Sequence, residues 1–156
     1  MKNIKLIVLD VDGVMTDGSI YYDDNGTEYK RFNVKDGFAI KHALKKGIKM
    51  GIITGRISSV VEKRCNELGI QFVFQNVKDK VKICDELVEK LNLSYTHVAY
   101  MGDDIPDLPL IKKVGFSGAP IDAVKKVKKA ANFISVYPGG KGAVREFIER
   151  IVGEIG

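Results

Sequence analysis

The sequence predicts an α/β fold, a three-layer, Rossmann-like parallel sheet with helices on both faces. Short apolar runs rich in β-branched residues alternate with longer segments of helical period, which is typical of repeated strand–helix–strand units. The 156 residues suit one domain, and no linker, repeat or change of composition marks a boundary. We therefore expect a single domain over residues 1–156, from which only a β-hairpin flap at about residues 19–32 projects.

The strands are predicted from apolar runs that polar residues and glycines interrupt. Runs of four or five apolar residues are typical of parallel strands that are buried on both faces. The hairpin has a different signature, because residues 23–26 (Asp-Asp-Asn-Gly) form a turn sequence in which Asn-Gly tolerates positive φ. Its strands are expected at residues 19–22 and 27–32, and sheet strands at residues 5–9, 49–53, 71–74, 97–101, 116–117 and 133–134.

The helices are predicted from apolar residues at helical spacing and from capping residues at the helix ends. Asp36 is expected to cap a helix over residues 37–46 that ends at Gly47. Ser58 is expected to cap a second helix, which ends at Gly69. Four more helices are expected at residues 79–91, 106–113, 122–131 and 143–152.

Charge and composition exclude several partners. The net charge is only +5, and the longest basic cluster, residues 125–129, has the pattern of a solvated helix face without interleaved aromatic residues, so no nucleic acid is expected. Cys65 and Cys84 lack metal-binding spacing and are expected to be reduced and structural. No apolar stretch approaches membrane-spanning length, and residues 1–5 enter a strand without a cleavage signature. We therefore expect a cytoplasmic protein without a membrane partner.

Carboxylates gather at the predicted carboxyl ends of the strands, where doubly wound sheets bind ligands. Asp10 and Asp12 follow the first strand, and Asp103 and Asp104 follow the fourth, with Asp107 just beyond. Such carboxylates repel one another unless a cation is bound, and hard oxygen ligands favour Mg²⁺. The same edge is expected to carry Thr54, Gly55 and Arg56 after the second strand and Lys80 at the start of a helix.

Two other kinds of site use similar residues, a calcium-binding loop and a nucleotide-binding loop, but the spacing in this chain matches neither. A calcium loop counted from Asp10 needs Gly at its sixth position and Glu at its twelfth, where the chain has Met15 and Tyr21. Residues 139–142 (Gly-Gly-Lys-Gly) do not form a Walker nucleotide-binding loop, because Ser135 stands where its first Gly belongs.

The strand-end residues resemble the four motifs of the haloacid dehalogenase superfamily of phosphatases. These motifs are residues 9–18 (LDVDGVMTDG), residues 53–56 (ITGR), Lys80 and residues 102–104 (GDD), in the family's order. The resemblance narrows to the 3-deoxy-D-manno-octulosonate 8-phosphate phosphatase family and covers nearly the whole chain. The segments that narrow it are residues 32–37 (FNVKDG), 64–70 (RCNELGI) and 139–146 (GGKGAVRE).

The resemblance implies Mg²⁺-dependent hydrolysis of 3-deoxy-D-manno-octulosonate 8-phosphate to the free sugar acid and phosphate, through an aspartyl-phosphate. Asp10 would be the nucleophile. Asp12 would protonate the leaving sugar oxygen and then activate water. Thr54 would bind a phosphoryl oxygen, and Lys80 would offset its charge. The implied metal ligands are the Asp10 carboxylate, the Asp12 carbonyl and the Asp103 carboxylate, with Asp104 and Asp107 behind them.

The resemblance also implies which residues select the substrate. Arg56 favours the eight-carbon sugar acid, because relatives that act on nine-carbon sugar acid 9-phosphates are expected to carry an acidic residue after the Thr-Gly pair. A phosphatase for a nine-carbon sugar acid remains the alternative, and the effect of Glu67 is open. Besides Asp12 and Lys80, the implied substrate-binding residues are Asn33, Val34, Lys35, Asp36, Gly37, Lys41, Arg56 and Arg64.

The hairpin takes the place of the cap domain that many superfamily members carry, so no cap domain is expected. The resemblance implies a homotetramer in which the hairpin and the C-terminal segment of one subunit border the site of its neighbour. Tyr21, Tyr22 and Tyr29 would be costly to leave exposed on an isolated hairpin. Residues 139–142 are either a mobile gate that brings Lys141 to the site or a plain turn.

A phospho-receiver or a binding module without enzymatic activity is the remote alternative. A receiver places its phospho-accepting Asp at the third strand, which here ends in Gln75 and Asn76, whereas Asp10 follows the first. The sequence leaves open whether the product supplies lipopolysaccharide or another glycan.

Overall fold

The structure, a computed structural model, describes residues 3–156 and contains a six-stranded parallel sheet. Its strand order is β5-β4-β1-β6-β7-β8, so successive segments of the chain build outward on either side of β1. The predicted fold class is confirmed, and each sheet strand lies within two residues of its predicted bounds. Residues 1 and 2 of the predicted domain lie outside the described residues. The strands are β1 (Leu6–Leu9), β4 (Lys49–Ile53), β5 (Phe72–Phe74), β6 (Val98–Met101), β7 (Phe116–Ala119) and β8 (Phe133–Ile134).

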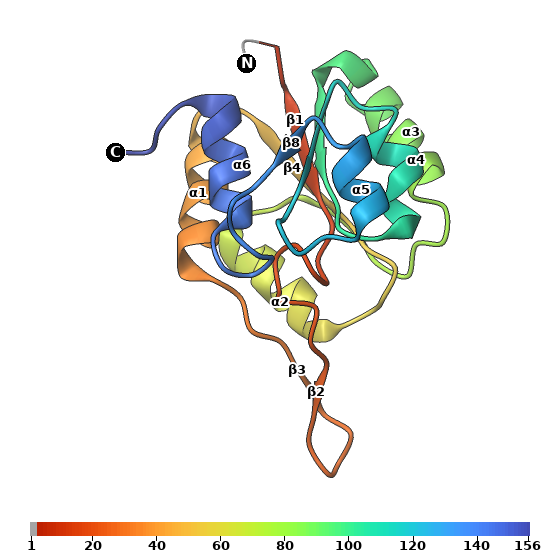
Figure 1. Cartoon of the computed structure of the whole chain (residues 1–156), viewed down its shortest axis with the longest axis vertical. Coiled ribbons are helices and arrows are strands. Elements are labelled where there is room, and N and C mark those ends of the chain that lie inside the picture. Colours follow the sequence, from red (N-terminus) through yellow and green to blue (C-terminus); the bar gives the residue numbers. More distant parts are fainter. Residues whose placement is uncertain (1–2) are drawn as a thin grey trace.

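Helices cover both faces of the sheet (Figure 1), and each face buries its own apolar cluster. Residues 3–156 contain no cap domain and no helix with the length and apolar character that crossing a membrane requires. One layer consists of α1 (Val34–Lys45), α2 (Ser59–Leu68) and α6 (Ala143–Val152), and the other of α3 (Lys80–Lys90), α4 (Leu108–Ile111) and α5 (Lys125–Ala130).

The start of α1 differs from the prediction. Asn33, and not Asp36, is the N-cap, and its Oδ1 accepts the backbone N–H groups of Lys35 and Asp36 at 2.8 and 3.3 Å. Asp36 is buried inside the first turn, where its Oδ1 accepts the backbone N–H of Arg145 at 2.9 Å. Asp36 therefore anchors the first turn of α6 to α1.

Two other helices are shorter than predicted. The run expected at residues 106–113 begins as a 3₁₀ turn, Ile105–Asp107, because Pro109 lacks the N–H that a continuous α-helix would bond to the Ile105 carbonyl. The helix expected from residue 122 begins only at Lys125. Lys125, Lys126 and Lys129 are exposed around the buried Val127, which confirms that this basic cluster is a solvated helix face.

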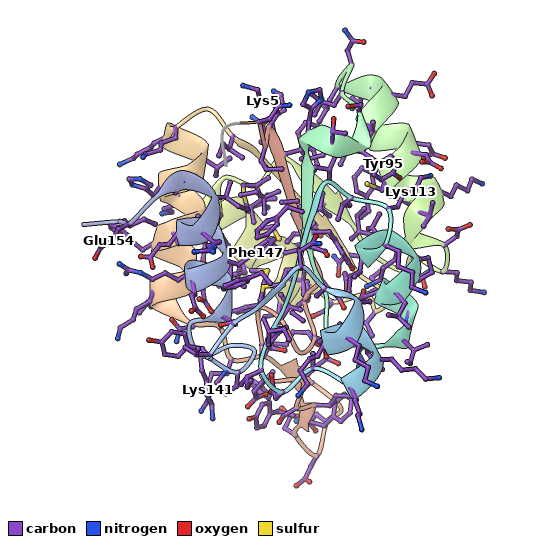
Figure 2. The ribbon with its side chains drawn as sticks, turned by 45° about the horizontal axis from the view of Figure 1, so that its top comes forward. Lys5, Tyr95, Lys113, Lys141, Phe147 and Glu154 are labelled. Atoms are coloured by element: carbon purple, nitrogen blue, oxygen red, sulfur yellow. The ribbon has the colours of Figure 1, made fainter. Side chains whose placement is uncertain are left out.

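Helix α6 packs tightly on the sheet through Phe147. Figure 2 shows this side chain directed from α6 toward the sheet, and its ring stacks on Phe116 with 5.4 Å between centroids. A Cβ atom at Gly118 would lie 2.6 Å from the Phe147 ring, so glycine is required there. This packing fixes α6, and with it the glycine-rich loop that precedes the helix.

The hairpin projects from the body of the molecule (Figure 1). Its strands, β2 (Tyr21–Tyr22) and β3 (Glu28–Tyr29), are antiparallel and shorter than predicted, because the chain on either side turns back toward the sheet. In the turn, Asp23 accepts two backbone N–H bonds, and Gly26 has a φ of 77°. Asn25, the other half of the predicted Asn-Gly pair, is not in the left-handed region.

Candidate active site

A cavity of about 540 Å³ opens at the carboxyl edge of the sheet, where β1 separates the two directions in which the chain winds. The three central strands each deliver one predicted residue to it: Asp10 follows β1, Thr54 follows β4 and Asp103 follows β6. The cavity lining is Asp10, Asp12, Gly18, Thr54, Gly55, Arg56, Val77, Lys78, Lys80, Asp103, Asp104, Pro106 and Asp107.

Asp10 is buried at the floor of this cavity. Its Oδ1 accepts the backbone N–H of Val11 at 2.8 Å, and its Oδ2 lies 3.1 Å from the Lys80 Nζ. Burial, reinforced by the Asp107 carboxylate, raises the pKa of Asp10 to about 6, although Lys80 opposes this shift. The contacts with Val11 and Lys80 thus hold the Asp10 carboxylate in the lining of the cavity.

Asp107 is the centre of the hydrogen-bond network behind Asp10. Its Oδ1 accepts from the Lys80 Nζ at 2.6 Å and from the Tyr100 hydroxyl at 2.5 Å. Its Oδ2 accepts the backbone N–H groups of Asp103 and Asp104 at 2.8 and 3.0 Å. Four donors therefore occupy both oxygens of Asp107, which orients Lys80 and the turn after β6 and leaves little capacity to bind a metal ion directly.

The residues present fit a hard divalent cation. One carboxylate oxygen from each of Asp10, Asp103 and Asp107 lies within 4.8 Å of the other two. Burial and the neighbouring carboxylates of Asp10 and Asp107 raise the pKa of Asp103 to about 8. Carboxylates that repel one another in this way are stabilised by a bound cation, and Mg²⁺ prefers oxygen ligands together with several waters. Because Asp107 is already saturated, Asp10 and Asp103 are the side chains available as ligands.

Gly13 is required by the approach of Asp103. A Cβ atom at this position would lie 2.0 Å from the Asp103 Oδ2, and the residue has a φ of 84°. The glycine of the Asp-x-Asp-Gly motif therefore makes room for the carboxylate from β6.

Asp12 has a partner that the sequence analysis missed. The Lys30 Nζ, from the end of the hairpin, lies 2.6 Å from the Asp12 Oδ1 and 3.2 Å from the Glu28 Oε1. Glu28 in turn binds Arg56 at 2.6 Å through its other oxygen, and Arg56 also donates to the Tyr22 hydroxyl. The tight turn and the charged residues Glu28, Lys30 and Arg31 were the available signals, but they do not show which of the two cations faces the sheet.

Most of the predicted substrate-binding residues outside the motifs do not reach this cavity within one chain. Arg56 lines it, as does Lys78, an exposed lysine that the sequence analysis did not select. Arg64 lies beside Gly37 and pairs with Glu67 at 3.4 Å, which gives Glu67 a contact that the sequence left open. The other predicted residues lie on the first turns of α1 or at its cap: Asn33, Val34, Lys35, Asp36, Gly37 and Lys41.

The loop at residues 139–142 packs against the segment that follows Asp12. The Gly140 N–H donates to the Val14 carbonyl at 2.9 Å, and a Cβ atom at Gly139 would lie 1.9 Å from the Gly13 carbonyl oxygen. These contacts describe an ordered turn in this conformation. Lys141 lies toward the hairpin end of the molecule (Figure 2) and lines a separate cavity together with Lys35 and others.

The fold and the carboxylate-lysine site define a class of hydrolases. Residues 70–148 match the model of a family described as haloacid dehalogenase-like hydrolase. The chain belongs to these haloacid dehalogenase-like hydrolases, as its motifs predict.

Relatives define the branch of that class. The chain is 44% identical to the 3-deoxy-D-manno-octulosonate 8-phosphate phosphatase of Escherichia coli K12 over 97% of this chain and 80% of that protein. It is 42% identical to the phosphatase of the same name from Yersinia pestis over 96% of this chain and 80% of that one. Its family within the class is therefore that of the 3-deoxy-D-manno-octulosonate 8-phosphate phosphatases.

Solved structures agree with this placement. One is the enzyme of that name from Moraxella catarrhalis, in complex with a magnesium ion, a phosphate ion and a KDO molecule; it is 40% identical, with a TM-score of 0.95 over 97% of this chain and 87% of that one. The cobalt-bound phosphatase from Haemophilus influenzae is 39% identical, with a TM-score of 0.92 over 96% of this chain and 88% of that one.

Proposed function

We propose that the protein hydrolyses 3-deoxy-D-manno-octulosonate 8-phosphate to the free sugar acid and phosphate, with Mg²⁺ as cofactor. The observation that carries this proposal is the buried Asp10, held at the open edge of the sheet beside Lys80 and Asp103. The family membership and the magnesium and phosphate ions named for the Moraxella catarrhalis relative support the same chemistry.

In the proposed reaction, the Asp10 carboxylate attacks phosphorus, and the bond from phosphorus to the sugar oxygen breaks. Asp12 transfers a proton to that oxygen, and in the second half it takes a proton from the water that hydrolyses the aspartyl-phosphate. Thr54 and Lys80 bind the phosphoryl oxygens from the cavity wall. Asp10, Asp103 and the Asp12 carbonyl would hold Mg²⁺, which would supply positive charge to the phosphoryl group, while Asp104 and Asp107 hold the turn that carries Asp103.

The substrate's carboxylate needs cations outside this phosphoryl site. Arg56 and Lys78 line the same cavity and are available to it once Arg56 exchanges Glu28 for the substrate. Lys35 and Lys41 on α1 do not line this cavity and are proposed to act across a subunit boundary.

We further propose that the active form is a homotetramer in the cytoplasm. The hairpin exposes Tyr21, Tyr22 and Tyr29 by 42%, 61% and 54%, and Val34 and Phe38 on α1 are exposed by 79% and 58%. Such apolar area is favourably buried against a second copy. A monomeric mass in sedimentation at micromolar protein would contradict the assembly.

The free cysteines, Cys65 and Cys84, are consistent with the proposed cytoplasmic location, because the cytoplasm is a reducing compartment. The product would then enter lipopolysaccharide or another glycan.

A phosphate-release screen tests the substrate. The wild-type protein is compared on eight-carbon sugar acid 8-phosphate and nine-carbon sugar acid 9-phosphate, each with Mg²⁺ and with excess chelator. We expect Mg²⁺-dependent release with a higher kcat/KM for the eight-carbon compound. A higher kcat/KM for the nine-carbon compound would favour the alternative substrate.

A further inference from the structure

The hairpin carries a buried lysine directed at the sheet. The Lys30 side chain is only 2% exposed, although the strand before it projects into solvent. Its Nζ lies between two carboxylates, 2.6 Å from the Asp12 Oδ1 and 3.2 Å from the Glu28 Oε1. The neighbouring cation, Arg31, is 62% exposed and reaches only Asp17, at 3.7 Å. The two adjacent residues therefore have opposite environments, and of the two only Lys30 contacts Asp12.

Stability alone explains this arrangement poorly. Removing a lysine from water carries a desolvation cost that its ion pairs often fail to recover, and apolar side chains commonly fill such positions without loss. The hairpin is also attached to the body through the Glu28–Arg56 pair at 2.6 Å. The Lys30 ammonium group in contact with the Asp12 carboxylate is therefore better explained by the role of Asp12 in the reaction.

Asp12 needs a defined orientation. It lies in the turn after β1, and its side chain is 24% exposed, so the walls of the cavity do not confine it. A short side chain has three staggered positions about χ1, and a group that transfers a proton must be within hydrogen-bond reach of the reacting oxygen. Among residues 3–156, Lys30 is the side chain that pairs with the Asp12 carboxylate.

We propose that Lys30 is a positioning residue for Asp12, an inference that rests on the proposed phosphatase function. Lys30 holds the Asp12 carboxyl group toward the leaving sugar oxygen, and Glu28 holds Lys30 in place. As the proton passes from Asp12 to that oxygen, negative charge develops on Asp12, and the Lys30 ammonium group stabilises it. The hairpin thereby contributes to the chemistry of its own subunit, besides any contact with a neighbour.

The leaving group distinguishes this role from a structural one. An alkyl phosphate such as the sugar acid phosphate needs a proton on its leaving oxygen, whereas p-nitrophenyl phosphate releases a stable anion and does not. Lys30→Met should lower kcat/KM for the sugar acid phosphate by about 10- to 100-fold and for p-nitrophenyl phosphate by less than about threefold. Lys30→Arg should restore most of the loss. Arg31→Met, the matched control, should leave both values within about twofold, as expected for an exposed side chain.

A double variant distinguishes a positioning role from a general loss of folded protein. If Lys30 acts through Asp12, adding Lys30→Met to Asp12→Asn should cause no further loss on the sugar acid phosphate. Equal losses on the two substrates, or a double variant that loses activity by the product of the single effects, would overturn the positioning role while leaving the phosphatase function intact. A wild-type protein without Mg²⁺-dependent release from either substrate would overturn the proposed function and this inference together.

Discussion

Contacts of single atoms determine the geometry of the proposed metal site. The Asp103 carboxylate lies over the Cα of Gly13, and Asp107 uses both oxygens to hold the turn from which Asp103 projects. The ligand positions are therefore determined by contacts between two strand ends, β1 and β6, that neighbour each other in the sheet. Small changes at this junction should affect Mg²⁺ before they affect the fold.

Gly13→Ala tests this junction. Its Cβ would lie 2.0 Å from the Asp103 Oδ2, so we expect loss of Mg²⁺ binding in titration calorimetry and of phosphatase activity. Gly26→Ala is a matched control, because its φ of 77° is close to the 84° of Gly13 but nothing lies within 4 Å of the added Cβ. Both variants should lose about 1 kcal/mol of stability from backbone strain. Equal Mg²⁺ affinity in the two variants would contradict the assigned role of Gly13.

The pKa values of Asp10 and Asp103 predict how the metal-free protein responds to pH. Both are raised above the ordinary aspartate value of 3.8, to about 6 and about 8. Between about pH 4 and pH 8 the folded chain therefore holds protons that the unfolded chain has released, so the free energy of unfolding falls as pH rises. Mg²⁺ binds the ionised carboxylates and removes this penalty.

We expect the melting temperature of chelator-treated protein to fall from pH 5 to pH 8, and the increase caused by Mg²⁺ to be larger at pH 8. Asp103→Asn should show a shallower fall and little response to Mg²⁺. Thermal unfolding followed by circular dichroism measures both effects. An increase with Mg²⁺ that is the same at the two pH values would contradict the assignment.

At the scale of elements, the start of α1 contains both the cap of that helix and a contact with α6. Asn33 caps α1, while Asp36, two residues into the helix, accepts the backbone N–H of Arg145 in the first turn of α6. Burial raises the pKa of Asp36, although the backbone N–H groups of Arg145 and Gly142 oppose this shift by hydrogen bonding to its carboxylate. Residues 33–36 therefore connect α1 to α6 and to the glycine-rich loop, residues 139–142.

Asn33→Ala tests the cap. It removes two hydrogen bonds to backbone N–H groups, and we expect it to lower the free energy of unfolding by about 1 kcal/mol in urea denaturation. Asn33→Ser keeps a capping oxygen and should retain most of that stability. If Asn33→Ala were as stable as wild type, the position of the cap would be wrong.

These elements show how far the sequence could lead. The strand-end carboxylates, Thr54 and Lys80 were predictable, because parallel strands bring their carboxyl ends to one edge whatever the loops do. Asn33 and Asp36 are both good capping residues, and only the contact with α6, more than a hundred residues away, decides between them. Lys30 was missed because the bend of the hairpin determines which side chain faces Asp12, and no local pattern encodes that bend.

At the scale of the whole molecule, the α/β fold leaves the candidate active site open at one edge of the sheet. The cavity is lined by the turns after the central strands, and residues 3–156 provide no domain that covers it. The hairpin reaches the site through Lys30 and Glu28 while exposing its tyrosines on the outside. Under the two proposals, one face of the hairpin acts on its own site and the other contacts a neighbouring subunit of the tetramer.

The central claim, a Mg²⁺-dependent phosphatase with Asp10 as its nucleophile, is tested most directly by the initial rate of phosphate release from 3-deoxy-D-manno-octulosonate 8-phosphate. With Mg²⁺, the wild-type protein and Asp85→Asn, a control on an exposed ion pair with Lys113, should release phosphate at similar rates. Asp10→Asn should be slower by a factor on the order of 10⁴ or more, and excess chelator should abolish the wild-type rate. Release that persists in Asp10→Asn or in chelator would contradict the account.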